Sequence, residues 1–207
     1  MEQGTTEWFE ARLGKVTASR VVDVVAMTKS GYSASRANYM AQLVVERITG
    51  KVEESYSNAA MAWGTEHEPM ARAEYEILRG VMVNEIGFVP HPTIENSGAS
   101  PDGLVNDKGL IEIKCPNTAT HIETLLTREI PKKYICQMFW QMACTGREWC
   151  DFVSYDPRMP DHLKLCVINV PRNEELIGEL ETEIAKFLKE VDLKVENLIN
   201  LTGQTND

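Results

Sequence analysis

The chain has 207 residues, of which 43% are hydrophobic and 25% are charged, a composition typical of a single globular domain. This composition excludes a disordered or fibrous chain. The longest apolar stretch, from Val21 to Met27, is interrupted by Asp23 and is far shorter than the roughly 20 residues that a membrane-spanning helix needs. The first residues have neither a basic start nor an apolar segment, so no secretion signal and no membrane association are predicted, and we expect a cytoplasmic protein.

Charge is distributed unevenly along the chain. The 21 basic and 31 acidic residues give a net charge of -10, which by itself disfavours a nucleic-acid ligand. Residues 1–50 nevertheless carry six basic against five acidic side chains, whereas Glu174–Glu196 carries eight acidic and three basic ones. A locally basic DNA-binding surface is therefore compatible with the sequence.

The five cysteines form no C-x-x-C pair, and their odd number argues against a disulfide framework. We expect them to be small core residues rather than metal ligands.

The first third of the chain is predicted to be helical. Thr17 and Ser33 are suitable N-caps, and Gly50 and Gly80 are suitable C-terminal stops. The helices expected between these signals cover Ala18–Met27, a segment from Ser33 to Gly50, and roughly Met61–Arg79.

Short β-branched segments separated by Pro, Asn, Asp and Gly come next and predict strands, with one further helix among them. The predicted strands are Val81–Val89, Gly98–Val105, Gly109–Cys115, Trp149–Tyr155 and Leu163–Val170, and the helix is Lys132–Cys144.

The final segment, about 173–200, begins at the potential N-cap Asn173 and has apolar residues at helical spacing. It predicts an acidic amphipathic helix with a solvated outer face, and a partner-binding face is the alternative. No repeat or linker interrupts the sequence, so residues 1–207 are predicted to form one domain. The order of elements predicts an α/β fold in which a mixed central β-sheet is flanked by helices, after a helical N-terminal third.

One predicted hairpin places ionisable side chains together. The segment Asn106–Gly109 is typical of a type I turn followed by a glycine bulge. In the register that this turn sets, Leu104 lies opposite Glu112, and Asp102 lies opposite Lys114. Asp102, Glu112 and Lys114 then project from one face, where the two carboxylates could share an ion.

Glu112 and Lys114 alternate with apolar residues, and charges in such a strand are costly unless they are paired or bind metal. An ion pair on a solvated strand face is the simplest alternative. Pro101-Asp102, nine intervening residues and Glu112-x-Lys114 together, however, resemble the PD-(D/E)xK nuclease core, a restriction-endonuclease-like fold. On this interpretation Asp102 and Glu112 hold Mg²⁺ or Mn²⁺, the metal activates water, and Lys114 orients or deprotonates that water.

The resemblance extends along most of the chain, to the lambda-type exonucleases, which are YqaJ-like viral recombinase nucleases. The segments that carry it are Trp8-x-x-x-Arg12-Leu-Gly14, Thr17-Ala-Ser19, Ala62-Trp-Gly64 through Glu68, Ser100-Pro-Asp-Gly-Leu104, Glu112-Ile-Lys-Cys-Pro116, Tyr134-x-x-Gln137 and Tyr155-Asp-Pro-Arg158. This resemblance implies a phage or prophage enzyme that degrades one strand of double-stranded DNA from a 5′-phosphorylated end, in the 5′-to-3′ direction. It also implies a ring-shaped homotrimer, two Mg²⁺ ions per site, and a single-strand annealing protein that receives the 3′ strand.

The same resemblance implies further site residues. Glu68 would be another metal-site carboxylate, the backbone carbonyl of Ile113 a further ligand, and Gln137 a polar group near the attacking water. The residues implied in the 5′-phosphate pocket are Arg12, Ser19 and Ser100. Trp8 could stack near the DNA end, and a tryptophan in the core or at an interface is the equal alternative. A departure from the expected pattern is Glu66, an additional acid beside Glu68.

Two other functions fit parts of the pattern. An endonuclease of repair or restriction type needs the trio Asp102, Glu112 and Lys114 but no pocket for a 5′ end. A non-catalytic DNA-binding recombination scaffold would need neither carboxylates nor lysine. The intact trio argues against the scaffold, and Arg12 with its two serines argues against the endonuclease.

Overall fold

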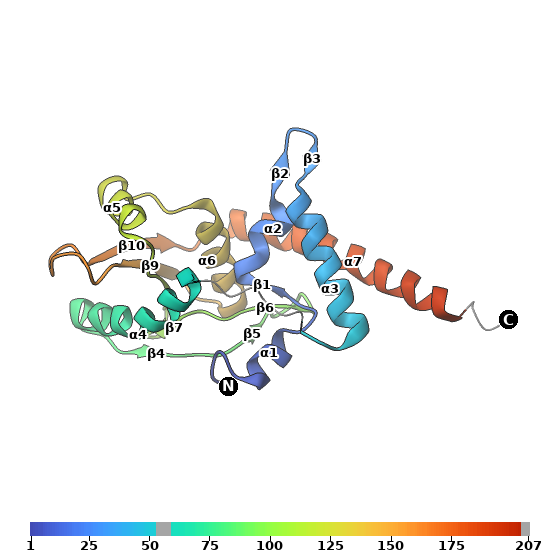
Figure 1. The fold of residues 1–207 in the computed structure, drawn as a ribbon, viewed down its shortest axis with the longest axis horizontal. Helices are drawn as coiled ribbons and strands as arrows, with labels where there is room; N and C mark the ends of the chain where they lie inside the picture. Colours follow the sequence, from blue (N-terminus) through green and yellow to red (C-terminus); the bar gives the residue numbers. More distant parts are fainter. Residues whose placement is uncertain (53–58, 204–207) are drawn as a thin grey trace.

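The computed structural model describes residues 1–52 and 59–203, and its centre is a five-stranded mixed sheet in the order β10-β9-β8-β7-β4 (Figure 1). β8 and β9 are parallel, and the other neighbours are antiparallel. The strands are β4 (Val83–Asn84), β7 (Gly103–Val105), β8 (Gly109–Lys114), β9 (Trp149–Tyr155) and β10 (Leu165–Pro171). The predicted mixed sheet flanked by helices is confirmed.

Helices dominate the N-terminal part, as predicted. They are α1 (Thr6–Arg12), the 3₁₀ helix η1 (Ala18–Arg20), α2 (Val21–Val25), α3 (Ala34–Thr49) and α4 (Ala59–Arg79). Gly50 and Gly80 follow α3 and α4 with φ of 65° and 64°, so both predicted glycine stops are confirmed. The α1 helix was not predicted. Its N-cap is Thr5, whose hydroxyl accepts a hydrogen bond from the Trp8 N–H at 3.4 Å.

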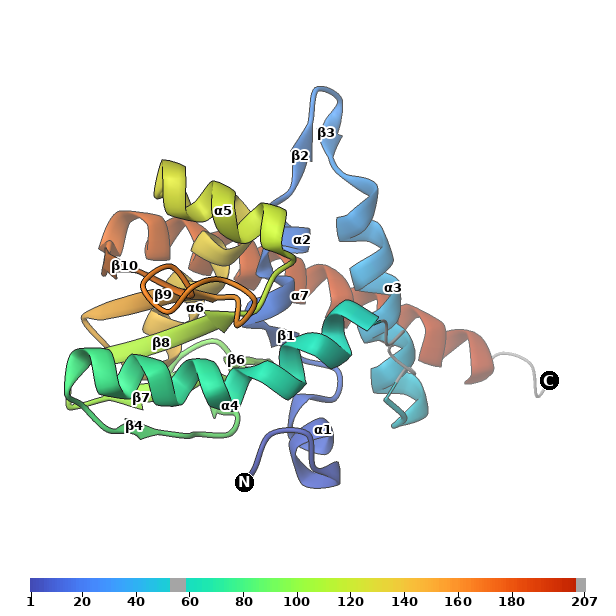
Figure 2. The same cartoon turned by 60° about the vertical axis from the view of Figure 1, so that its left-hand side comes forward.

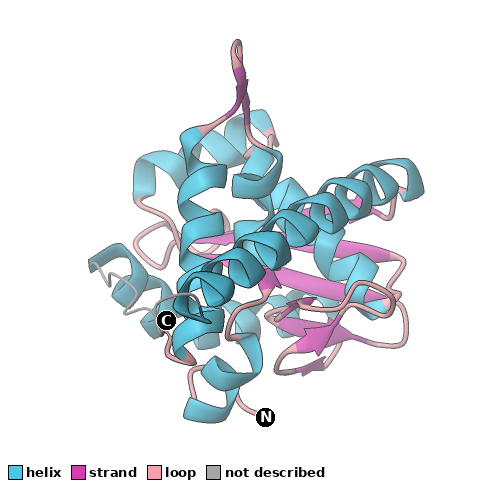
Figure 3. Cartoon of the chain, turned by 90° about the vertical axis from the view of Figure 1, so that its right-hand side faces the viewer, coloured by secondary structure: helices cyan, strands magenta, loops and turns pink. Residues whose placement is uncertain are grey.

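The single helix predicted for Ala18–Met27 is wrong. The chain forms η1 and the five-residue α2, and then leaves the helical region at Ala26 (φ -66°, ψ 126°). Four of the five residues of α2 are valines, whose branched side chains lose rotamer freedom in a helix. The hairpin of β2 (Met27–Thr28) and β3 (Gly31–Tyr32) follows and projects from the body, at the top of Figures 1 and 3.

Two of the predicted strands are each divided between two sheets. Gly98–Val105 forms β6 (Ser97–Ala99) and β7, and Val81–Val89 forms β4 and the start of β5 (Val89–Pro90). β6 pairs with β5 and, in parallel, with β1 (Val16–Thr17). The break after β6 contains Pro101, which has no N–H to donate to a ladder.

The hairpin between β7 and β8 has a different turn from the predicted one. Three residues connect Val105 to its partner Gly109, and Asn106 rather than the glycine adopts the left-handed conformation, with φ of 48°. Leu104 consequently pairs with Leu110, two residues short of the predicted partner. Because side chains alternate with a period of two, this shift leaves each residue on the face predicted for it.

Helices cover both faces of the sheet (Figure 2). On one face, Ile111, Ile113 and Val153 pack with α4 residues such as Ala71 and Tyr75. On the other face, the larger core combines β8 and β9 with α2, α3, α6 (Lys132–Thr145) and α7 (Glu174–Gly203). The helix α5 (Thr118–Thr127), which was not predicted, begins at the N-cap Asn117 and contacts β9.

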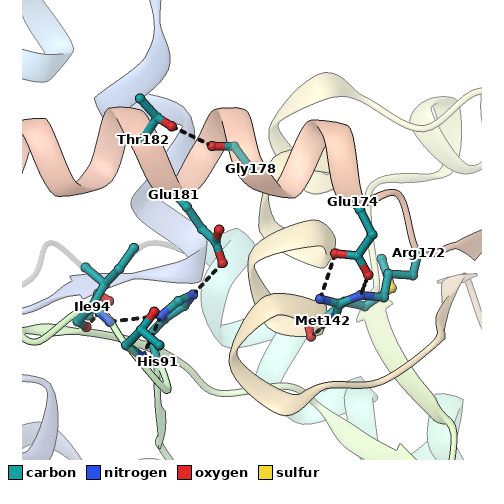
Figure 4. Close-up of polar contacts among 10 residues, drawn as sticks. His91, Ile94, Met142, Arg172, Glu174, Gly178, Glu181 and Thr182 are labelled. Carbon is teal, nitrogen blue, oxygen red and sulfur yellow. Dashed lines mark hydrogen bonds and ion pairs between the residues drawn. The ribbon is translucent and has the colours of Figure 1, made fainter.

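The acidic C-terminal helix is confirmed as α7. The N-cap side chain of Asn173 accepts a hydrogen bond from the Leu176 N–H at 3.1 Å. Side chains near the start of the helix contact neighbouring elements (Figure 4). Arg172 donates to the Met142 carbonyl at 2.5 Å, and His91 Nε2 lies 3.2 Å from Glu181 Oε1. The end of α7 extends past α3 (Figure 1).

The cysteines form no disulfide: four of the five are buried, as expected, and Cys115 is half-buried. None of the helices in residues 1–52 and 59–203 is long and apolar enough to cross a membrane.

Candidate active site

The candidate site is centred on β8, whose alternation turns Glu112 and Lys114 toward the same face of the sheet. The Glu112 side chain has no exposed surface, and its Oε1 forms an ion pair with Lys114, whose side chain is 27% exposed. Burial lowers the pKa of the Lys114 ammonium, but the charges of Glu112 and Asp102 outweigh this effect and raise the pKa above its ordinary value. The Lys114 side chain is therefore protonated at neutral pH.

Asp102 lies directly before β7, and continuing the observed ladder places it opposite Glu112. Its Oδ2 accepts a hydrogen bond from the Ile113 N–H at 2.6 Å. The carboxylate therefore takes the place of the backbone carbonyl that a longer β7 would offer to this N–H. Burial raises the pKa of Asp102 well above its ordinary value, and the charge of Glu112 adds to this, whereas Lys114 and the Ile113 N–H oppose it. The predicted trio is therefore brought together by the fold.

Glu68 approaches the trio from α4. Burial raises the pKa of its carboxyl group, the charges of Arg72 and Lys114 oppose the rise, and that of Glu112 adds to it. Arg72 also donates to Glu68 Oε1 at 2.7 Å. Glu66, by contrast, is exposed and does not line the adjacent cavity, so Glu68 is the carboxylate that α4 contributes.

The amide that contacts the trio comes from a residue that sequence reasoning missed. Gln141 of α6 is fully buried, and its Nε2 donates to Glu112 Oε2 at 2.6 Å. Gln137 lies one turn earlier on the same helix, is half-buried, and its side chain makes no hydrogen bond within the described ranges. The four-residue spacing was the available signal, since it places both amides on one side of the helix.

A cavity of about 800 Å³ lies beside the trio and joins two groups of predicted residues. Trp8, Arg12 and Ser19 line it together with Glu68 and Asp102. These side chains come from α1, η1, α4 and the segment before β7, so segments far apart in the sequence meet at this cavity.

Three of the predicted phosphate-binding residues, Trp8, Arg12 and Ser100, contact one another in this region. The Arg12 guanidinium lies over the Trp8 ring, 3.8 Å from its centroid, and the Trp8 indole N–H donates to Ser100 Oγ at 2.9 Å. Burial lowers the pKa of Arg12 to about 10, although Tyr39 and Glu46 oppose this shift, so the guanidinium remains charged at neutral pH. Ser19 is exposed on the three-residue η1 rather than at the start of a long helix.

Oxygen ligands of the kind that Mg²⁺ prefers are therefore close together, but in the described structure each carboxylate already has an internal partner. Glu112 is bonded to Lys114 and Gln141, Asp102 to the Ile113 N–H, and Glu68 to Arg72. Accordingly, no cluster of three or more His, Cys, Asp or Glu side chains within the described ranges is arranged as a finished metal site. Burial is the main cause of the raised pKa of Asp102 and the charge of Glu112 adds to it; a divalent cation at this position would oppose both effects.

A second connected set lies at the same end of the sheet, after β9. The buried carboxylate of Asp156 accepts hydrogen bonds from the Arg158 N–H and Nε at 3.0 and 2.7 Å. The Arg158 guanidinium stacks over the Trp63 ring at 4.6 Å, and Trp63 stacks on His67. These contacts tie the segment after β9 to α4.

A family model described as the YqaJ-like viral recombinase domain matches residues 7–148. That range covers more than half of the chain and includes every site residue described above except Asp156 and Arg158. The chain belongs to this family, that of the lambda-type exonucleases. The resemblance to this family that the sequence motifs indicated is therefore confirmed.

Solved structures support this assignment. The alkaline exonuclease of Laribacter hongkongensis is 56% identical, with 97% of this chain and 99% of that chain covered and a TM-score of 0.90. Its complex with dAMP matches with the same identity and coverage and a TM-score of 0.91. A phage-related exonuclease from Haemophilus somnus 129PT, 16% identical over 89% of this chain and 96% of that chain, has a TM-score of 0.72 and supports the fold alone. A comparison with curated protein sequences found no match.

Proposed function

We propose that this member of the DNA exonuclease family is a Mg²⁺-dependent enzyme that degrades one strand of double-stranded DNA in the 5′-to-3′ direction. Its substrate is a duplex end with a 5′-phosphate, and its product is a 3′ single strand used in annealing-type recombination. The observation that carries this proposal is the cavity shared by Arg12, Ser19 and the carboxylates Glu68 and Asp102. A pocket for a terminal phosphate beside the cutting centre distinguishes an end-dependent enzyme from an endonuclease.

The acidic side chains would hold the metal. Glu68, Asp102 and Glu112, with the Ile113 carbonyl, provide the hard oxygen donors that Mg²⁺ and Mn²⁺ prefer, in a number sufficient for two ions. When bound, the metal supplies Lewis acidity, which lowers the pKa of the attacking water and offsets the charge of the scissile phosphate. Lys114, whose ammonium is protonated beside Glu112 and Asp102, would orient that water, with Gln137 as a further polar group nearby.

The basic and aromatic side chains of the cavity would bind the DNA end. The Arg12 guanidinium presents donors in a planar fork that matches a phosphate, and the hydroxyls of Ser19 and Ser100 add neutral donors. Trp8 holds Arg12 and Ser100 through its ring and its N–H. The complex of the 56% identical relative with dAMP supports a site that accepts a nucleoside monophosphate.

Family membership also supports a ring-shaped homotrimer, a single-strand annealing protein as partner, and a phage- or prophage-encoded enzyme in the cytoplasm of a bacterial host. A ring would enclose the duplex. An acidic outer surface, to which α7 contributes, and a less acidic channel would then coexist despite the net charge of -10.

The deciding experiment compares a linear 5′-phosphorylated duplex with closed circular DNA, each in Mg²⁺ and in EDTA. We expect release of nucleotides from the linear duplex in Mg²⁺ alone, and no nicking of the circle. The Glu112→Gln variant, which preserves shape, should be inactive on both substrates. Nicking of the circle would show that the protein is an endonuclease and not an exonuclease. Activity in EDTA would refute the metal requirement.

A further inference from the structure

Gln141 is a polar side chain in an apolar environment. It lies on α6 within the run Met138–Cys144, whose residues are all buried, and its own exposure is 0%. An amide in such a place costs free energy unless hydrogen bonds replace its contacts with water. The reason for a glutamine here must therefore lie in what the amide contacts.

The amide contacts the Glu112 carboxylate, and this contact fixes its orientation. Gln141 Nε2 donates to Glu112 Oε2 at 2.6 Å, whereas Gln141 Oε1 is buried and accepts no hydrogen bond from the described residues. The opposite orientation would place an amide oxygen against a carboxylate oxygen. A bond to a charged acceptor is stronger than one between neutral groups, which explains why the amide nitrogen takes this position.

Glu112 is consequently held at both oxygens. Lys114 pairs with Oε1 from the same strand, and Gln141 bonds Oε2 from the helix that covers that face of the sheet. Two contacts from different elements define the plane of the carboxylate and the directions of its free lone pairs. Groups that hold a metal ligand in this way strengthen metal binding without touching the ion.

We infer that Gln141 is a positioning residue that presents the Glu112 carboxylate to a divalent cation. The inference rests on the proposed function, which takes Glu112 as a metal ligand. It gives Gln141 a role distinct from that of Gln137, which the family resemblance places near the attacking water.

The test measures Mn²⁺ affinity of the full chain by calorimetry, without DNA, so that the readout does not depend on catalysis. We expect Gln141→Met, which keeps the volume and removes the amide, to weaken Mn²⁺ binding by about 10- to 100-fold. Met142→Leu is the matched control, because Met142 is the equally buried neighbour on the same helix, and it should bind Mn²⁺ as the wild type does. Circular dichroism in EDTA checks that each variant is folded.

The Glu112→Gln variant distinguishes failure of the proposed function from failure of the positioning role of Gln141. If it binds Mn²⁺ as tightly as the wild type, the metal assignment of the proposed function is wrong. If Glu112→Gln loses affinity but Gln141→Met retains it, the positioning role of Gln141 is wrong and the proposed function stands. Should Gln141→Met fail to fold, Gln141→Asn replaces it: its amide is withdrawn by about 1.5 Å, and wild-type affinity in that variant overturns the inference.

Discussion

At the scale of single residues, Glu112 contributes both to the stability of the fold and to the proposed cleavage reaction. Its carboxylate has no exposed surface and is bonded to Lys114 and Gln141. Removing one partner of a buried charged pair typically costs about 3–5 kcal/mol. Truncation of Glu112 or Lys114 to alanine therefore disturbs folding as well as cleavage, and substitutions that preserve shape are the ones that isolate the chemistry.

Arg12 is expected to determine the preference for a phosphorylated end. We expect Arg12→Ala to lower the rate on a 5′-phosphoryl duplex by about 10- to 100-fold, because a hydrogen bond to a charged group contributes roughly 1.5–3 kcal/mol. The rate on a 5′-hydroxyl duplex should change little, so the ratio of the two initial rates should approach one.

Arg147→Ala is a suitable control for this experiment, because it also removes one positive charge. Arg147 donates to the Asn106 carbonyl in the turn between β7 and β8 and does not line the cavity. It should preserve the rate ratio of the wild type. An unchanged ratio in Arg12→Ala would instead assign the terminal phosphate to other side chains.

The sequence predicts the position of the trio in the site better than that of Gln141. Asp102, Glu112 and Lys114 could be predicted together, since ionisable residues that alternate within an apolar strand must share a face. The four-residue spacing places Gln141 on the same side of the helix as Gln137, but it does not show what the amide contacts, because an amide within a helix is equally compatible with solvent. Only the packing of α6 against β8 shows that this amide meets a carboxylate.

At the scale of elements, the helices and strands with strong end signals were predicted closely, and the turn geometry was not. The predicted strand Trp149–Tyr155 and the glycine stops agree with the structure. The hairpin register was wrong by two residues, because Asn106 and Gly109 can each take a left-handed conformation and only tertiary packing selects Asn106. In the observed backbone, the Trp149 ring lies where a side chain at Gly109 would project.

Gly109 illustrates that packing constraint. A Cβ added there would lie 2.2 Å from two ring atoms of Trp149, whereas a Cβ at Gly178 in α7 would have no atom within 4 Å. We expect Gly109→Ala to lower the free energy of unfolding by about 1–3 kcal/mol. Gly178→Ala should raise it by about 0.5–1 kcal/mol, because alanine is the better helix former.

Thermal unfolding followed by circular dichroism measures both changes. For a chain of this size, each kcal/mol corresponds to roughly 2–4 °C in Tm, so the two variants should move in opposite directions. Equal Tm values for Gly109→Ala and the wild type would mean that the Trp149 ring moves aside at no cost.

The contact between Asp156 and Arg158 predicts a pH dependence of stability. Burial raises the pKa of Asp156, but hydrogen bonds from Arg158 and Thr118 outweigh it and lower the pKa from 3.8 to about 2. A carboxyl group with a lowered pKa in the folded state stabilises the protein above pH 4, and this contribution is lost as the pH falls from about 4 to 2. It amounts to about 2 kcal/mol at most, since the Arg158 side chain is 48% exposed and screened by solvent.

Urea unfolding of the wild type and Asp156→Asn at pH 6 and pH 3 checks this expectation. The wild type should be the more stable protein at pH 6, and the difference should shrink at pH 3. A difference independent of pH would show that the aspartate acts through shape rather than through its charge.

At the scale of the whole molecule, the order of elements was sufficient to predict a mixed sheet between helices, but not the cavity. Its walls come from α1, η1, α3, α4 and the segment before β7, and no local pattern specifies how distant segments meet. The division of the predicted strand Gly98–Val105 had the same origin, because β6 joins β1 in a separate sheet.

The proposed ring makes a direct prediction about mass. Light scattering coupled to size-exclusion chromatography should give about three times the monomer mass of 23.3 kDa. A ring that encloses its substrate should also remain on one DNA molecule when excess competitor duplex is added during digestion. A mass equal to that of one monomer at micromolar concentration would refute the proposed ring.

The cavity contains a side chain, Trp8, that can serve as an intrinsic fluorescent probe. Trp8 is half-buried, its indole N–H is bonded to Ser100, and the Arg12 guanidinium covers its ring. A phosphate that drew Arg12 and Ser100 toward itself would change the polarity around the indole, and with it the emission wavelength. With the other tryptophans, Trp63, Trp140 and Trp149, replaced by phenylalanine, the fluorescence of Trp8 can thus follow the arrival of a DNA end in Ca²⁺ or EDTA, before any bond is cut and without an attached dye.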